Sequence, residues 1–179
     1  MKKISVLLGA FLTLLFISCE SLDGRDGIDG EDGVNITGTV IDIEGTFDAT
    51  NEYSILYEFP QTIEVFETDV VLVYLLWDQT EDSNGEAVDI WRLLPQTRIL
   101  DQGLLQYNFD HTFLDVNIFL ESDFDLSTLL PGDTDNQVFR IAVLPAEALQ
   151  TGKLDTSNIH AVMGRFGISE KDIQKIRLD

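Results

Sequence analysis

The chain has 179 residues, of which 32 are acidic and only 11 are basic, so that its formal charge at neutral pH is −21. A surface of this sign repels nucleic acid and anionic lipid headgroups, and it favours divalent cations or basic partners. Apolar residues make up 44% of the sequence and include eleven phenylalanines, which argues against a disordered chain and for one domain with a substantial core.

The N-terminal segment has the composition of an export signal. Two lysines precede residues 4–18, a mostly apolar run that is shorter than the roughly 20 residues of a membrane-spanning helix. Residues 16–19 (FISC) resemble the lipobox of bacterial lipoproteins, which implies cleavage before Cys19 and lipidation of its thiol. An uncleaved signal anchor is the alternative. Cys19 is the only cysteine, so no disulfide can form within the chain.

A second segment, residues 20–35, has glycine at every third position from Gly24 to Gly33, each preceded by aspartate. We interpret it as a flexible spacer that reaches at most roughly 50 Å when extended. A collagen-like triple helix and weak calcium binding by the aspartates are alternatives, although the spacing does not match an EF-hand loop. The sequence thus divides into a signal peptide (1–18), a lipidated cysteine with its spacer (19–35) and a folded domain (36–179).

Short strands separated by polar turns fill most of the third segment. Residues 70–77 (VVLVYLLW) are apolar at odd and even positions alike, which predicts a strand covered on both faces. Asn84-Gly85 predicts a hairpin, with a return strand at 87–94 that ends at Pro95. Alternating patterns predict further strands at 53–59, 105–109, 116–120 and 139–143. This spacing is typical of an antiparallel β-sandwich, either Ig-like or jelly-roll-like.

The C-terminal part changes to a helical pattern. A helix is predicted from about residue 156 to 165, because capping hydroxyl residues precede an apolar face and Gly167 follows it. Residues 169–172 (SEKD) resemble a capping box that opens a second short helix. We expect these short helices to close one end of the sandwich.

Acidic turns provide a candidate calcium site. Its ligands would be Asp78, Asp82 and Asn84 in the hairpin and Asp133 and Asp135 in a later turn. Hard oxygen ligands on loops suit Ca²⁺, but the same residue types are also ordinary in turns.

No motif predicts an enzyme. The sequence has no Gly-x-Ser-x-Gly elbow, and its two histidines, His111 and His160, are few for a zinc site. His111 continues the inward parity of its strand, so we expect it to end a buried face. A glycosidase-like carboxylate pair needs only two acids and stays open as an alternative. Trp77 and Trp91 are expected in the core, with a sugar-stacking platform as the alternative.

Several short motifs accompany the lipobox and the glycine tract: VNI (34–36), VLVY (71–74), LPQT (94–97), FDHTF (109–113), NIF (117–119) and TDNQVFRI (134–141). Together they are similar to a family of Bacteroidetes lipoproteins that are described as collagen-like and have no assigned activity. The resemblance covers nearly the whole chain and implies localisation at the outer membrane. Glu20 and Asp23, just after Cys19, are similar to the surface-export signals of that phylum.

We therefore expect a membrane-anchored, surface-exposed lipoprotein that acts as a non-catalytic binding or structural module of the cell envelope. The compatible partners are a glycan, a peptide or another envelope protein, and nucleic acid is not among them. The alternatives are a hydrolase of exported polymers and a calcium-stabilised binding module.

Overall fold

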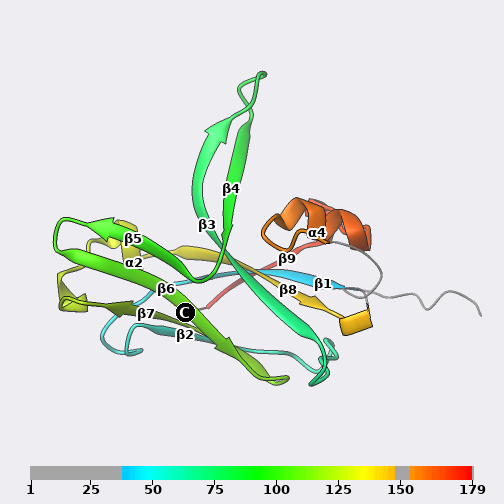
Figure 1. Ribbon diagram of the computed structural model, residues 1–179, viewed down its shortest axis with the longest axis horizontal. Helices are drawn as coiled ribbons and strands as arrows, with labels where there is room; N and C mark the ends of the chain where they lie inside the picture. The colour runs from blue at the N-terminus through cyan, green and yellow to red at the C-terminus, as the bar shows by residue number, and fades with distance from the viewer. Residues whose placement is uncertain (1–37, 148–153, 179) are drawn as a thin grey trace, which may run out of the picture. The chain divides into compact units, whose positions relative to one another are not determined.

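The computed structural model describes residues 38–147 and 154–178, so Cys19 and the glycine tract lie outside the described residues. Two sheets face each other and form a β-sandwich, which confirms the predicted fold class (Figure 1). Sheet A contains, in spatial order, β4 (Ala87–Leu93), β3 (Val70–Glu81), β8 (Gln137–Leu144), β1 (Thr39–Gly45) and β9 (Gln174–Arg177). Sheet B contains β2 (Ser54–Glu58), β7 (Asp115–Ser122), β6 (Gly103–His111) and β5 (Gln96–Leu100).

Neighbouring strands run antiparallel, with one exception. The short strand β9, which the sequence analysis did not predict, pairs in parallel with β1 at the edge of sheet A. The edge strand β5, which follows Pro95, was also not predicted.

The core between the sheets arises from alternation along the strands. In β8, Phe139, Ile141 and Val143 face this core, whereas Arg140 and Ala142 point to the outer face of sheet A. Burying each large apolar side chain stabilises the fold by about 1.5–3 kcal/mol. The inner face of sheet B supplies the opposing side chains, among them Leu105, Tyr107, Val116 and Ile118.

A second core covers part of the outer face of sheet A. Tyr74 and Leu144 pack there against Val162 and Met163 of helix α4 (Ile159–Phe166). The prediction that residues 70–77 are covered on both faces is therefore confirmed up to Leu75, whereas Leu76 is outside both cores. The prediction that the C-terminal helices close one end of the sandwich is wrong for α4, because its apolar face packs on the apolar outer surface of the sheet.

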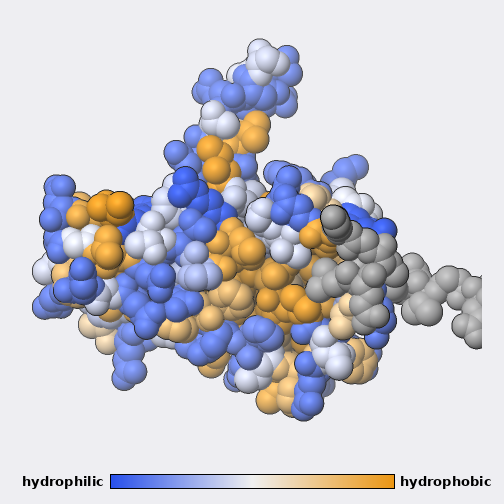
Figure 2. Space-filling model, viewed as in Figure 1, coloured by the Kyte–Doolittle hydropathy of each residue, from blue (hydrophilic) through white to orange (hydrophobic). Residues whose placement is uncertain are grey.

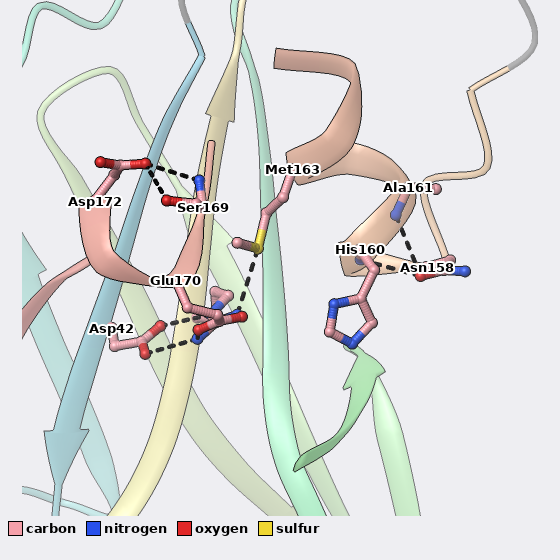
Figure 3. Close-up of polar contacts among 9 residues, drawn as sticks. Asp42, Asn158, His160, Ala161, Met163, Ser169, Glu170 and Asp172 are labelled. Carbon is pink, nitrogen blue, oxygen red and sulfur yellow. Dashed lines mark hydrogen bonds and ion pairs between the residues drawn. The ribbon is translucent and has the colours of Figure 1, made fainter. Parts of the chain in front are cut away.

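The ends of the C-terminal helices follow local capping chemistry. The side chain of Asn158 accepts from the backbone N–H groups of the first turn of α4, and Gly167 ends the helix at φ +66°. The capping box at Ser169 and Asp172 is confirmed and opens the short helix η3 (Glu170–Asp172) (Figure 3). The chain then enters β9.

The hairpin β3–β4 projects away from the two sheets (Figure 1). Gly85 has φ +79° at its tip, as the Asn-Gly pair predicted. The tip is hydrophilic, and apolar residues already appear along the arm below it (Figure 2). The hairpin residues that pack in the two cores are those up to Trp77 in β3 and from Trp91 in β4. Only the base therefore takes part in the two cores.

Candidate functional site

A groove of about 300 Å³ lies on the part of sheet A that α4 leaves uncovered. Leu76, Trp91 and Val138 give it an apolar lining on the outer face of the sheet. Its polar lining consists of Asp42, Glu44, Gln79, Asp89, Lys175 and Arg177. The volume is at the lower end of the roughly 300–1,000 Å³ that small-ligand sites occupy.

Trp91 is held at the edge of this groove by Arg140. The guanidinium carbon of Arg140 lies 4.3 Å from the centroid of the Trp91 ring, which is a cation–π contact. Arg140 is only 1% exposed, although arginine is almost never fully buried unless it is paired. The ring is therefore fixed on one side and half-buried in the groove.

Two carboxylates neutralise Arg140, and they converge on the same guanidinium (Figure 3). Nε and Nη2 donate to Asp42 over 2.7 and 2.9 Å, and Nη1 and Nη2 donate to Glu170 over 2.7 and 2.8 Å. Nη1 also contacts the Met163 sulfur at 3.4 Å. All five N–H donors of the guanidinium thus have acceptors within the protein, so Arg140 positions Trp91 and η3 and has no donor left for a ligand.

The electrostatics keep Arg140 and Glu170 ionised. Burial lowers the pKa of Arg140, but its hydrogen bonds to Asp42 and Glu170 outweigh burial, and the net pKa is raised. The hydrogen bond from Arg140 lowers the pKa of Glu170. Both groups therefore stay charged at neutral pH.

The remaining charges of the groove balance. Asp42 is paired with Arg140, which leaves Glu44 and Asp89 against Lys175 and Arg177. Gln79 donates to Asp89 over 2.7 Å, and Arg177 lies 3.5 Å from Glu44 with its side chain exposed. An apolar floor with a balanced polar rim suits a neutral ligand that has an apolar face.

A larger hollow, of about 510 Å³, lies beside the β1–β2 connection. Its polar groups bond mainly to one another. Asp48 accepts from the backbone of Thr50 and Asn51, and Arg177 donates to Asn136. We therefore regard the groove beside Trp91 as the better candidate site.

The hairpin residues of the predicted calcium site serve the turn itself. Asp82 accepts from the backbone N–H groups of Asn84 and Glu86 over 2.8 and 2.9 Å, and these backbone bonds, that of Glu86 first, lower its pKa. Asp78 lies within strand β3 and accepts from the N–H of Gln79.

The other two predicted ligands lie near helix α2 (Pro131–Thr134), outside the hairpin. Asp133 pairs with Arg98 at 2.8 Å, and Asp135 accepts from the hydroxyl of Thr134. Within residues 38–147 and 154–178, no group of three His, Cys, Asp or Glu side chains is placed to hold a metal ion. The calcium hypothesis stays a prediction.

The expectation that His111 ends a buried face is wrong, whereas Trp77 and Trp91 both pack against apolar cores as expected. His111 is exposed and stacks on Phe109, with centroids 6.2 Å apart, because the loop after β6 lies at the open end of the sandwich. Trp77 packs against the core between the sheets, whereas Trp91 packs on the outer face of sheet A. The two tryptophans therefore cannot form one platform, and each instead packs in its own cluster.

The Arg140 cluster was not predicted from the sequence. Its local signal is a charged residue at an outward position of an otherwise apolar strand, seen both at Arg140 in β8 and at Asp42 in β1. Glu170 has no such signal, because it lies in an exposed turn of a polar segment.

Comparisons with known proteins add no relative. No protein-family model, curated protein or solved structure matches this chain. No helix in the described part of the chain is long and apolar enough to cross a bilayer.

Proposed function

We propose that the chain is an exported lipoprotein, anchored to the outer membrane through Cys19 and exposed at the cell surface, that binds a neutral glycan as a non-catalytic module of the cell envelope. Residues 1–18 would be removed, and residues 19–35 would tether the domain 36–179. The observation that carries the binding function is Trp91, fixed by Arg140 in a groove whose charges balance.

A glycan matches the chemistry of the groove. A sugar ring has an apolar C–H face that packs on an aromatic ring, and hydroxyls that bond to amide and carboxylate groups. Trp91 provides the ring, while Gln79, Asp89 and Lys175 provide polar groups around it. Holding the aromatic group in place before the ligand arrives lowers the entropy cost of binding.

Hydrolysis by a carboxylate pair has less support. A general acid needs a raised pKa, whereas Arg140 lowers the pKa of Glu170. Asp42, the most buried acid of the groove, is occupied by the same guanidinium.

The anchor is tested with Cys19→Ala in the full chain. We expect the variant to lose incorporation of radiolabelled palmitate and to keep residues 1–18, because cleavage and acylation both require the cysteine. Unchanged labelling would contradict the lipoprotein assignment. Protease accessibility on intact cells then tests surface exposure.

Binding is tested by retention on a panel of insoluble polysaccharides and by a glycan array. We expect Trp91→Ala to weaken binding of the retained glycan about tenfold or more, which corresponds to about 1.4 kcal/mol. Lys175→Ala, which leaves Trp91 in place, should weaken it less. Ile90→Ala is the matched control, since Ile90 is on the same strand, is 37% exposed and does not line the groove. Equal binding by the folded Trp91 and Ile90 variants would refute the assignment of the groove.

A further inference from the structure

Three exposed apolar side chains gather at one end of the sandwich. Phe66 is 56%, Phe113 44% and Leu114 60% exposed; we call these residues the apolar tip. They lie on the β2–β3 and β6–β7 connections, and apolar residues appear at the lower edge of Figure 2, where Figure 1 shows these two connections. Clustered exposed aromatic residues mark interaction surfaces more often than isolated ones do.

The loops that present the apolar tip are locked by hydrogen bonds. The N–H of Phe66 donates to the Asp69 carboxylate over 3.0 Å, and the N–H of Asp69 donates back to the carbonyl of Phe66. Thr112 closes the second turn, because it donates its N–H to the carbonyl of Asp115 over 3.0 Å and its hydroxyl to the Asp115 carboxylate over 2.7 Å. The rings are thus displayed on ordered turns, which lowers the entropy cost of docking.

A cavity of about 190 Å³ opens between the two loops. Phe66 and Phe113 form part of its wall, and Glu67 contributes a carboxylate. The cavity is smaller than the roughly 300 Å³ lower limit for small-molecule sites, and it suits a single side chain of a larger partner. Its other lining residues are Val65, Asp69, Val71, His111 and Thr112.

The surroundings of the cavity are acidic. The sequence has no lysine or arginine between Arg25 and Arg92 or between Arg98 and Arg140, so neither loop carries a basic residue. Within the described residues, Glu67 has no ion-pair partner. An apolar surface flanked by Glu67 and Asp69, with no lysine or arginine on either loop, is complementary to a basic partner.

We propose that the apolar tip docks a basic protein segment, one Lys or Arg side chain of which enters the cavity. Its aliphatic stem packs between Phe66 and Phe113, and its charged end meets Glu67. This interaction surface is separate from the Trp91 groove, and it does not depend on glycan binding.

Two other occupants of the apolar tip can be distinguished from a basic protein segment. β1 begins at Thr39 and β3 begins at Val70, and these two residues pair with the adjacent residues Val143 and Leu144 of β8. The chain therefore enters β1 at the same end of sheet A as the β2–β3 connection, which carries Phe66. A lipid surface is therefore one competitor, although anionic headgroups are repelled by the acidic surroundings. A second copy of the chain is the other, although its own tip is equally acidic.

The test uses the full chain in phosphatidylcholine nanodiscs and a dye-labelled hexapeptide that alternates leucine with lysine or arginine. Fluorescence anisotropy measures the affinity of this peptide. The control is the same peptide with glutamate in place of every lysine or arginine. We expect the basic peptide to bind and the acidic one not to bind. The double variant Phe66→Ser/Phe113→Ser should weaken binding about tenfold or more, as loss of anchor residues does at interfaces.

Charge and position are tested with matched variants. Glu67→Gln keeps the apolar tip and should weaken binding severalfold at low salt, with less effect at high salt. Ile99→Ser is the control, because Ile99 is 86% exposed and apolar but lies on β5, outside the cavity. The proposal is overturned if both peptides bind alike, if Ile99→Ser weakens binding as much as the tip variant, or if the tip variant instead abolishes self-association or binding to anionic vesicles.

Discussion

Sheet A carries two tryptophans on opposite faces, and each lies against an arginine. On the outer face, Arg140 covers Trp91 at 4.3 Å and is bound by two carboxylates. On the inner face, Trp77 lies between Arg92 and Arg98, at 3.9 and 4.7 Å. The same pair of residue types thus occurs in two environments.

The two arginines differ in how many of their hydrogen-bond donors have an acceptor. Arg140 is 1% exposed and uses all its donors, whereas the Arg98 side chain is 23% exposed and, among the described residues, forms an ion pair only with Asp133. The buried Nε of Arg98 has no partner in the described part of the chain. A rigid, fully paired charge is suited to hold a binding surface in place, so the comparison favours the Trp91 side as the functional one.

The largest effect is expected from Arg140→Ala. Removing the guanidinium leaves Asp42, whose side chain is 6% exposed, as an uncompensated buried charge. We expect the free energy of unfolding to fall by about 3–5 kcal/mol, measured by urea denaturation. In Asp42→Leu/Arg140→Met both charges are gone, and most of that loss should be recovered. A double variant as unstable as Arg140→Ala would show that the apolar contacts of Arg140, and not its charge, matter most.

A smaller effect is expected from Arg98→Met. Asp133, whose side chain is 13% exposed, loses its ion pair, but Trp77 stays covered by Arg92. We expect a loss of about 1–3 kcal/mol, the usual cost of one unsatisfied buried partner, in the same denaturation experiment. A loss equal to that of Arg140→Ala would remove the distinction between the two sites.

Local patterns account for the parts of the fold that were predicted. The doubly apolar run 70–77, the Asn84-Gly85 turn and the helix stop at Gly167 each depend on a few adjacent residues, and each is present in the structure. By contrast, β9 is a four-residue strand that owes its place to pairing with β1, far away in the sequence.

The candidate site was harder to predict because it is assembled from distant segments. Asp42 and Arg140 are 98 residues apart and meet only through the pairing of β1 with β8. Trp91 was recognised as an aromatic residue of interest, but its face of the sheet depends on the register of the hairpin, which has an irregularity between Leu76 and Asp78. A one-residue shift of register moves a side chain to the opposite face.

The smallest effect is expected from Glu170→Gln, and it separates the two carboxylates of the Arg140 cluster. The Glu170 side chain is 57% exposed, so its ion pair should contribute less than about 1 kcal/mol at neutral pH. The hydrogen bond from Arg140 lowers the pKa of Glu170 in the folded state, so this contribution is present above the ordinary glutamate pKa of about 4.3 and is lost as the pH falls through the lower folded value. The difference in unfolding free energy between wild type and Glu170→Gln should therefore shrink in acid. In the Arg140→Met background the same substitution should change little at either pH, and a difference that persists there would mean that Glu170 acts through a contact other than Arg140.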